Sequence, residues 1–599
     1  MQIRGFDSKW ILWMKELLTS AKTAILLNGI PGNWINIKRG LRQGDPLSPL
    51  LFIVVVDVLQ QAIKKSAASG SLRHPVLEDQ PCPVLQYADD TLIVIQGDVE
   101  QAKILKQILD DFASTTGLKI NFSKSTFVPI NLTMRESEEI ANALNCDVAS
   151  FPQVYLGLPL SDSKLPKEVF LPYILAVESR IGFSLHFITR GGRLTLTKSV
   201  LSALPAYLMS CFKLPQWVID ELERLLRAFF WKGKNSVNGS DCLVAWDYVC
   251  RSYEEGGLGI KNLRIQNDCL LTKFVHRFLT QPNSPWARWV VATHLQGKDF
   301  GDRPTTQTRV WKQMWGLIDT YRNATCVQLG DGITTSLWKD KWTSDGPLCF
   351  QFPALFSHTS RPNISVADCW RDGVWTIPFN HITSDRADQE KEALFRFLGT
   401  CNLQNLQGDK RGWRLDKTDC FSVSNLYNIM NWGGIKQESA ESIWRCAAPK
   451  KGKIFAWLLI KGRIKVRAVL LRQNIVDDER CPFGCKERET TEHFALNCGR
   501  TIQILALLGI NLTSCEKLTN IFDTARERCP PQKKKAWTLV ITAALWSTWL
   551  ARNRKVFDDV DIPVHIVAKQ CIDTCKLWTL RAKHEEKASI QHWLADWTV

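Results

Sequence analysis

Hydrophobic positions near the start of the chain follow helical spacing and then strand spacing. Between Ser8 and about Asn28 the apolar residues recur every three or four positions, and Asp7 or Ser8 stands where an N-cap belongs, so we expect a helix here. The residues of this apolar series are Trp10, Ile11, Trp13, Met14, Leu17 and Leu18. Residues 24–37 contain Asn28-Gly29 and Pro31-Gly32, which predict a pair of strands joined by tight turns.

A second helix and a hairpin are predicted further along the same region. Ser48-Pro49 suits an N-cap and a first helical position, and the apolar run from Pro49 to Leu59 follows it. This run is much shorter than the roughly 20 residues that cross a bilayer, and it contains Asp57. Residues 84–95 predict two short strands with Asp89-Asp90 between them, and residues 99–112 return to helical spacing.

The remainder of the chain changes character several times. Residues 160–280 predict mainly helices, whereas residues 281–440 are rich in Trp and in turn signals, which favours hairpins with interspersed helices. These turn signals are Gly330-Asp331-Gly332, Asp372-Gly373 and Gly408-Asp409. Further helices are predicted over Ile454–Leu471 and Trp537–Trp549. We therefore expect an α+β protein whose regions are 1–160, 161–280, 281–440, 441–515 and 516–599.

The composition of the chain indicates its class of protein and its class of binding partner. The 599 residues are 45% apolar and 23% charged, which is typical of globular proteins and excludes disordered, collagen-like and coiled-coil chains. Lys and Arg number 76 and Asp and Glu 60, so the net charge of +16 favours nucleic acid as a partner. Nineteen scattered cysteines without a secretory signal pattern predict a reducing, intracellular location and no membrane partner.

The acidic hairpin is the first candidate for chemistry. Nucleotidyl transfer with two metal ions needs carboxylates that are fixed on rigid elements, and a tight hairpin can present them. Taken alone, Asp89-Asp90 is more often a solvated turn pair, because Asp is a favoured turn residue. The interpretation therefore depends on what surrounds the hairpin.

An ordered set of motifs surrounds it. The set consists of Gly40-Leu41-Arg42-Gln43-Gly44-Asp45-Pro46-Leu47-Ser48-Pro49, Tyr87-Ala88-Asp89-Asp90, Gly117-Leu118-Lys119-Ile120-Asn121, Lys124-Ser125 and Tyr155-Leu156-Gly157. Together these motifs resemble the reverse transcriptases of plant LINE-type non-LTR retrotransposons. The resemblance covers about residues 5–500 and is strongest before residue 280.

The resemblance implies part of a right-hand polymerase palm, a helical thumb and an RNA-directed DNA polymerase lineage. Its substrates would be an RNA template, a DNA primer and deoxynucleoside triphosphates, and its location nuclear. The resemblance implies that Asp89 binds magnesium with Asp90 as its neighbour, and that Tyr87 contacts the nucleotide and the primer end. It implies template or nucleotide contact by Arg42, Gln43 and Gly44, and pyrophosphate contact by Lys119 or Lys124. It also implies a primer grip at Tyr155, Leu156 and Gly157. The alternative is that these cations are solvated surface charges and the glycines simple turn formers.

One half of the polymerase site has no counterpart in these residues. In the family the first metal-binding Asp belongs to an Asp-x-x-x-Ala-Phe-Asp motif, upstream of a helix that begins with Gly-Phe. Here Gly5-Phe6 opens the sequence, and Asp7 matches the helix cap. A single carboxylate strand cannot anchor two cations, so we expect this chain by itself not to polymerise. The alternatives are a non-catalytic nucleic-acid-binding, zinc-binding relic and an unstable relic whose exposed core causes aggregation.

A second candidate site lies near residue 490. Cys481, Cys485, His493 and Cys498 form C-x3-C-x7-H-x4-C, a closed set of four ligands that suits structural zinc. The set resembles the zinc-binding region that follows the polymerase in this family, and the alternative is a group of reduced thiols beside a hydrogen-bonded histidine. Upstream, lysines and arginines alternate with Phe455 in residues 450–467, which favours either phosphate binding or an ordinary solvated helix face.

Overall fold

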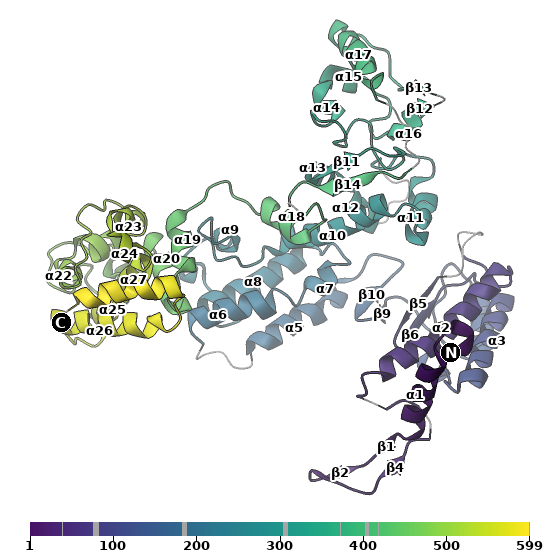
Figure 1. Ribbon diagram of the computed structural model, residues 1–599, viewed down its shortest axis with the longest axis horizontal. Helices are drawn as coiled ribbons and strands as arrows, with labels where there is room; N and C mark the ends of the chain where they lie inside the picture. Colours follow the sequence, from purple (N-terminus) through teal and green to yellow (C-terminus); the bar gives the residue numbers. More distant parts are fainter. Residues whose placement is uncertain are drawn as a thin grey trace. The chain divides into compact units, whose positions relative to one another are not determined.

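The computed structural model describes residues 1–38, 40–42, 44–75, 83–182, 188–302, 309–371, 373–401, 407–416 and 418–597. These residues form two compact units, one of Met1–Leu165 with Arg288–Val290 (unit 1) and one of Pro166–Ala287 with Val291–Val599 (unit 2). Both units combine helices with short strand pairs (Figure 1). The fold is therefore mixed α and β.

Unit 1 begins with the predicted helix, which is shorter than we expected. Its first elements are η1 (Gln2–Arg4), α1 (Ser8–Thr19), β1 (Lys22–Thr23), β2 (Leu26–Leu27), β3 (Ile30–Pro31) and β4 (Ile35–Asn36). The Asp7 carboxylate accepts a hydrogen bond from the Lys9 amide at 2.8 Å, so the predicted cap is confirmed. The prediction that the helix reaches about Asn28 is wrong: Ser20 caps the C-terminus, and its hydroxyl donates back to the Glu16 carbonyl.

Two short hairpin ladders follow α1. β2 and β3 pair through the turn at Asn28-Gly29, where both residues have positive φ, as a type I′ turn requires. β1 pairs with β4 around this inner hairpin. The strand pair predicted from Asn28-Gly29 is confirmed.

The core of unit 1 lies between two long helices and the acidic hairpin. The elements from residue 48 onward are α2 (Ser48–Ala68), β5 (Val84–Tyr87), β6 (Asp90–Ile93), α3 (Val99–Thr116), η2 (Phe122–Lys124), β7 (Thr126–Phe127), α4 (Met134–Leu144), β8 (Asp147–Val148), β9 (Gln153–Tyr155) and β10 (Leu158–Leu160). α2 and α3 pack side by side (Figure 1), and Val84 and Ile93 of the hairpin contact the core that these helices bury. This core holds the hairpin by its inward face.

The start of α2 differs from the expectation by one residue. Leu47, not Ser48, is the N-cap, and Ser48 is the first helical residue. The Asp45 carboxylate accepts the Leu47 amide at 2.8 Å, and the Ser48 hydroxyl donates to the Arg42 carbonyl at 2.8 Å. Ser48 therefore fastens the preceding loop to the helix instead of capping it.

Unit 2 begins with a helical region, as predicted. The elements from residue 166 up to residue 302 are η3 (Lys167–Phe170), α5 (Leu171–Gly182), α6 (Arg190–Leu196), η5 (Thr197–Leu201), α7 (Ala206–Met209), α8 (Gln216–Lys232), η6 (Gly239–Asp241), α9 (Trp246–Cys250), α10 (Leu263–Thr280), α11 (Pro285–Val290, whose second half is assigned to unit 1) and η7 (Val291–Leu295). α8 buries the aromatic side chains Phe229, Phe230 and Trp231 and packs against α5 and α6. These contacts make the region a helical core.

The Trp-rich region, residues 281–440, contains more helices than the turn signals predicted. Its strands also pair between positions that are further apart in the sequence. Its elements are α12 (Arg309–Trp315), α13 (Ile318–Ala324), β11 (Thr325–Gln328), α14 (Leu348–Gln351), α15 (Pro353–Phe356), α16 (Val366–Cys369), β12 (Trp370–Arg371), β13 (Val374–Trp375), α17 (Asp385–Leu398), β14 (Lys410–Trp413) and α18 (Val423–Met430). In the described part of this region only β12 and β13 form a local hairpin, because β11 pairs with the distant β14. Asp409 explains this closure: its carboxylate accepts the amides of Gly330 and Gly332.

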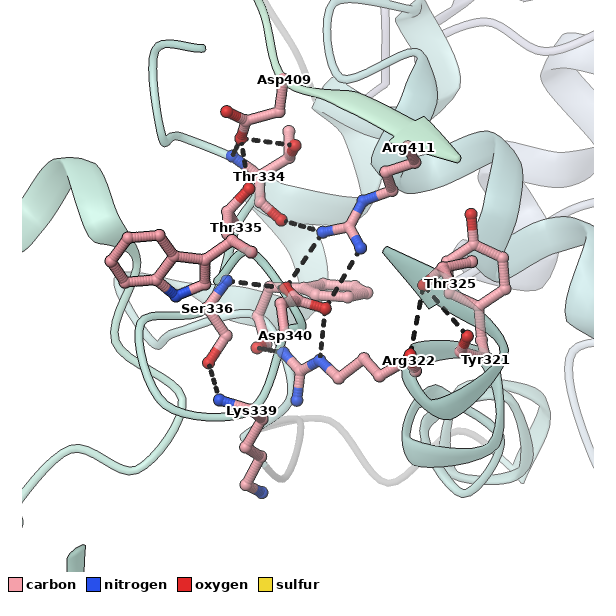
Figure 2. Close-up of polar contacts among 12 residues, drawn as sticks. Tyr321, Arg322, Thr325, Thr334, Thr335, Ser336, Lys339, Asp340, Asp409 and Arg411 are labelled. Atoms are coloured by element: carbon pink, nitrogen blue, oxygen red, sulfur yellow. Dashed lines mark hydrogen bonds and ion pairs between the residues drawn. The ribbon is translucent and has the colours of Figure 1, made fainter. Parts of the chain in front are cut away.

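A buried ion cluster stabilises the same region (Figure 2). Both Arg411 terminal nitrogens donate to the Asp340 carboxylate at 3.1 Å, and Arg322 approaches the same carboxylate. Burial alone would raise the pKa of Asp340, but the two arginines and the Ser336 amide lower it. Both oxygens of the Asp340 carboxylate are thus paired with arginine, so we assign this cluster a structural role.

The C-terminal part of unit 2 is helical. Its elements are α19 (Glu438–Arg445), α20 (Lys450–Ile460), α21 (Arg467–Arg472), η8 (His493–Asn497), α22 (Gly499–Leu507), η9 (Leu518–Ile521), α23 (Thr524–Arg528), α24 (Pro531–Lys534), α25 (Trp537–Phe557), α26 (Val564–Thr579) and α27 (His584–Asp596). The helix predicted over Ile454–Leu471 is two helices, because Gly462 adopts positive φ after α20. In the described ranges no helix combines the length and apolar character needed to cross a membrane.

Candidate functional sites: an acidic hairpin and a metal centre

The acidic hairpin forms as predicted, but its turn lies one residue earlier than expected, because Asp90 belongs to β6 and does not lie between the strands. β5 and β6 are antiparallel, and Tyr87 pairs directly with Asp90 across the ladder. The turn is formed by Ala88, at φ +51°, and Asp89. Asp89 and Asp90 are exposed, and Tyr87 is 66% exposed. The hairpin therefore presents both carboxylates and one aromatic ring to solvent, with Asp90 on the strand itself.

The Tyr155-Leu156-Gly157 segment lies against this hairpin. β9 and β10 are joined at Leu156 and Gly157, both at positive φ. The Tyr155 hydroxyl donates to the Leu85 carbonyl of β5 at 3.2 Å. Burial, and then the charge of Asp90, raise the pKa of Tyr155. Two motifs about 70 residues apart in sequence are thus in contact.

The other predicted palm residues are exposed near their own elements. Arg42 and Gly44 belong to the loop before α2, where Gly44 has φ +86°, and Gln43 lies outside the described residues. Lys119 follows the C-cap of α3, and Lys124 ends η2. Among the described residues, no hydrogen bond or ion pair joins the side chains of Arg42, Lys119 or Lys124 to Asp89 or Asp90.

The second candidate site is a closed cluster of four side chains. In the described part of the chain, Cys481, Cys485, His493 and Cys498 are the one group of three or more potential ligands that could share a metal ion. Their ligand atoms all lie within 4.8 Å of one another, and the Sγ atoms of Cys481 and Cys498 are 3.8 Å apart. Tetrahedral zinc with bonds of about 2.3 Å places two sulfurs about 3.8 Å apart, so the cluster fits zinc.

The histidine of this cluster is oriented by a carboxylate. Nδ1 of His493 hydrogen-bonds to Oε2 of Glu487 at 2.9 Å. Nε2 is buried and has no hydrogen-bond partner among the described residues. An orphaned buried nitrogen beside three thiols is what a metal ligand requires, and the carboxylate on the opposite nitrogen holds the ring in place. Glu487 was not predicted from the sequence, although it lies only six residues before the histidine.

Local backbone structure brings the cysteines together. The Cys481 amide donates to the Glu487 carbonyl at 3.0 Å, and Gly484 allows the intervening turn at φ +86°. Cys498 is the N-cap of α22. A hydrogen bond from the Cys481 thiol lowers the pKa of Cys498; burial opposes this effect, and backbone amides at the start of α22 support it. The same hydrogen bond raises the pKa of Cys481, so the shared proton stays on Cys481 and the thiolate that zinc needs is favoured at Cys498.

A buried ion pair anchors the cluster to the C-terminal helices. Glu489 and Arg552 have side chains that are 2% and 0% exposed, and Nε of Arg552 donates to Oε1 of Glu489 at 2.8 Å. The other carboxylate oxygen accepts the Arg467 amide at 2.6 Å. Glu489 thus connects the cysteine hairpin to α25 and α21. The sequence gives no distinct signal for this pair, because Arg552 is the first residue of the polar segment Arg552-Asn553-Arg554-Lys555 at the end of α25.

Both candidate sites lie in regions that match known protein families. Residues 2–159 match the family "reverse transcriptase (RNA-dependent DNA polymerase)", and residues 421–504 match "zinc-binding in reverse transcriptase". An Arabidopsis thaliana protein described as a ribonuclease H protein is 27% identical over 67% of this chain and 66% of its own length. An uncharacterized mitochondrial protein of Arabidopsis thaliana is 30% identical over 24% of this chain and 94% of its own length.

A third relative comes from a mobile element of an insect. The Pol polyprotein of the type-1 retrotransposable element R2 from Popillia japonica is 30% identical over 22% of this chain and 18% of its own length. The chain thus spans less than two thirds of the length of both the ribonuclease H relative and this polyprotein.

The acidic hairpin and the Cys3His cluster, each inside a matched region, define the class as reverse-transcriptase proteins with a zinc-binding region. The chain belongs to the reverse-transcriptase family of non-LTR retrotransposons. The family predicted from the motifs is confirmed.

Proposed function

We propose that unit 1 is part of the palm of an RNA-directed DNA polymerase of a plant LINE-type element. The contact between Tyr155 and β5 carries this proposal, because it joins the two motifs that would hold the primer end. In this role Tyr87 lies beside the incoming nucleotide and the primer terminus, and Tyr155, Leu156 and Gly157 form the primer grip. The helical region that follows residue 161 serves as the thumb.

The remaining roles concern the template and the triphosphate. Arg42, Gln43 and Gly44 contact the template or the nucleotide, and Lys119 or Lys124 neutralises the departing pyrophosphate. The substrates are an RNA template, a DNA primer and deoxynucleoside triphosphates. A nuclear location follows only from the family and stays a prediction.

Asp89 and Asp90 are the proposed magnesium ligands. Bound magnesium ions would activate the primer hydroxyl and screen the charge of the triphosphate. In the described part of the chain no third carboxylate lies close enough to share a metal ion with this pair, and the Asp7 carboxylate caps α1. We therefore propose that the chain by itself does not polymerise.

The Cys3His cluster is proposed to hold one structural zinc ion. Its four side chains fill a tetrahedral coordination shell and leave no position for a substrate, unlike a catalytic zinc site. His493 would bind through Nε2 while Glu487 fixes Nδ1. The zinc would fasten the hairpin before α22 to the helical core.

Two assays with purified, zinc-loaded chain test the proposal. The first places a photoreactive 4-thiothymidine at the primer 3′ end on an RNA template, and we expect crosslinks at β5 and its turn. Crosslinks confined to unit 2 would contradict the palm assignment. The second is primer extension with magnesium, where we expect no incorporation. Incorporation that Asp89→Asn abolishes and the matched control Asp111→Asn preserves would show that the metal site is complete.

A non-catalytic nucleic-acid-binding protein is the second candidate. It is favoured by the net charge of +16 together with the incomplete carboxylate set. Salt-dependent binding without incorporation distinguishes it from an active polymerase. Aggregation of the purified chain would instead indicate an unstable relic, since several large apolar side chains of β2 and β3 are exposed.

A further inference from the structure

The end of α20 holds a lysine whose hydrogen-bond partners are all neutral. Lys461 is the C-cap residue of α20 and is half-buried. Its Nζ donates to the Tyr248 hydroxyl of α9 at 2.5 Å and to the side-chain oxygen of Gln437, the N-cap of α19, at 2.8 Å. Among the described residues no carboxylate forms an ion pair with Lys461. The amine is therefore held in place without a counter-charge.

The acids of the turn that follows α9 have other partners. The Glu255 carboxylate accepts from the Ser252 hydroxyl at 2.9 Å and from the Gly433 amide. Glu254 forms an ion pair with Lys436 at 3.6 Å. Neither acid is thus committed to neutralising Lys461.

The charge beside Lys461 is positive instead. Nζ of Lys461 lies 4.2 Å and Cζ of Arg251 5.2 Å from the centre of the same Tyr248 ring. Burial, and then the charge of Arg251, lower the pKa of Lys461 to about 8. At pH 7.5 roughly a quarter of such a lysine is neutral, against about 0.1% of a lysine with the ordinary pKa of about 10.4.

The two acceptors determine where the lone pair of the neutral amine is free. The Tyr248 hydroxyl donates its own proton to the Glu255 carbonyl at 3.0 Å, so its oxygen accepts from Lys461. The Gln437 oxygen also accepts. A neutral amine has two N–H donors and one lone pair, and these two acceptors use both donors. The lone pair is therefore not consumed by either contact.

A glycine keeps the space for this arrangement open. Gly256 has φ +81°, and a Cβ at this position would clash with the Gln437 side-chain oxygen and lie 2.7 Å from the Tyr248 hydroxyl. The Trp457 indole, one helical turn before Lys461, donates to the Gly256 carbonyl at 2.6 Å. This bond fixes the turn against α20, so the amine and its acceptors are positioned together.

We propose that Lys461 is a nucleophilic amine that thioesters acylate. The neutral amine attacks the carbonyl carbon of the thioester, the C–N bond forms and the C–S bond breaks. The electron pair leaves with the sulfur, and the thiolate takes up the proton that the nitrogen loses. Removal from water and a neighbouring cation are two features that activate lysine nucleophiles. Arg251 would stabilise the negative charge that develops on the carbonyl oxygen.

The same contacts favour an amide product over an imine. An amide nitrogen keeps one N–H for Tyr248 or Gln437, and its carbonyl oxygen offers Arg251 an acceptor. A neutral imine nitrogen has no N–H, and a protonated imine would restore a positive charge beside Arg251. The acyl group is therefore the class of modification that the site suits. This inference does not rest on the proposed function, because it involves neither polymerisation nor nucleic-acid binding.

Acetylation of the full, zinc-loaded chain by S-acetyl-N-acetylcysteamine, a small uncharged thioester, tests the inference. Peptide mass spectrometry follows the initial rate at each lysine across the pH range in which lysines titrate. The exposed Lys569 of α26 is the internal standard. We expect Lys461 to react about tenfold faster than Lys569 at pH 7.5. Its neutral fraction is roughly 200-fold larger than that of an ordinary lysine, and lower basicity and half-burial offset part of this gain.

Two variants change the surroundings of Lys461 and keep the amine. Gln437→Glu places a carboxylate against Nζ, which favours the charged form, and should slow acetylation at pH 7.5 at least tenfold. Arg251→Gln removes the neighbouring cation and should slow it about threefold. Arg135→Gln, whose side chain is 90% exposed on α4, is the control and should leave the rate at Lys461 unchanged. Circular dichroism melting checks that each variant folds, and the wild-type pH profile needs no variant.

Three results would overturn the inference. One is a rate at Lys461 that equals that of Lys569 and rises with pH in the same way, which would indicate an ordinary ammonium group. Another is a chain in which Lys569 is acetylated and Lys461 is not. The third is faster trapping of Lys461 by acetaldehyde with cyanoborohydride than by the thioester, relative to Lys569, which would indicate carbonyl chemistry instead of acylation.

Discussion

The acidic hairpin and the Cys3His cluster are both candidate metal sites, but they differ in how much of the site they contain. The hairpin displays two exposed carboxylates on a strand pair that is held from one side. The cluster brings four ligand atoms within 4.8 Å, three of them on buried residues, with the histidine already oriented. The cluster thus has a full set of four ligands for its proposed ion, whereas the hairpin has only part of the proposed magnesium site.

Sequence distance explains the difference. The four zinc ligands fall within residues 481–498, so one hairpin and one helix start can assemble them. A two-metal polymerase site needs carboxylates from separate strands, and among the described residues no group of three or more potential ligands includes the proposed magnesium ligands Asp89 and Asp90. Local ligands make a self-contained structural site, and non-local ligands make a site that depends on further packing.

Loss of the proposed zinc ligand Cys498 should give the largest loss of stability. Zinc binding to small structural sites contributes about 10–16 kcal/mol of apparent free energy, so Cys498→Ser should abolish zinc retention and lower the thermal midpoint of unit 2 by more than about 10 °C. Metal analysis and scanning calorimetry measure both effects. The exposed Cys420→Ser is the control. A variant that retains zinc and melts like wild type would show that Cys498 is only a packing residue.

The buried ion pair should give the next largest effect. Glu489→Gln leaves Arg552 buried without a counter-charge, which typically costs about 3–5 kcal/mol of unfolding free energy. Urea unfolding followed by circular dichroism measures this loss. Glu139→Gln removes an exposed partner of Arg135 and should change nothing measurable. Equal stability of the two variants would refute the anchoring role of Glu489.

The orientation of His493 can be tested without removing a ligand. Glu487→Gln weakens the hydrogen bond to Nδ1 and should lower zinc affinity about 10- to 100-fold, as other outer carboxylates do. Competition with a chromogenic chelator gives the affinity. Glu492→Gln, an exposed neighbour of the histidine, is the matched control. Identical affinities for both variants would mean that Glu487 does not position the ring.

The smallest effect is expected at the acidic hairpin. Tyr155→Phe removes one hydrogen bond to the Leu85 carbonyl, worth about 1 kcal/mol, and should speed amide exchange of β5 and β6 about fivefold. Hydrogen exchange with mass spectrometry measures it. Tyr87→Phe should leave exchange unchanged, because that ring is 66% exposed. No difference between the variants would show that Tyr155 does not brace the hairpin.

Local patterns in the sequence were sufficient for the elements whose cause is local. The Asp7 cap, the Asn28-Gly29 turn and the β5–β6 hairpin follow from one or two residues and from period-two alternation. The zinc ligand set also follows from spacing, since its members lie close together in the chain.

Features that depend on distant partners could not be predicted in the same way. Pairing of β11 with β14 depends on Asp409 accepting amides almost 80 residues away. The Glu489–Arg552 pair spans 63 residues, and only the folded helices place the two charges together. The end of α20 was missed because the apolar spacing continues past Gly462, where positive φ stops the helix.

Native mass spectrometry of the full chain, equilibrated with zinc and manganese and then desalted, tests the central contrast most directly. Manganese stands in for magnesium at carboxylate sites. The account predicts one zinc ion per chain and no retained manganese. A chain that retains manganese, and loses it on Asp89→Asn substitution, would show that the acidic hairpin is already a complete metal site. A chain that retains no zinc would contradict the assignment of the Cys3His cluster as a zinc site.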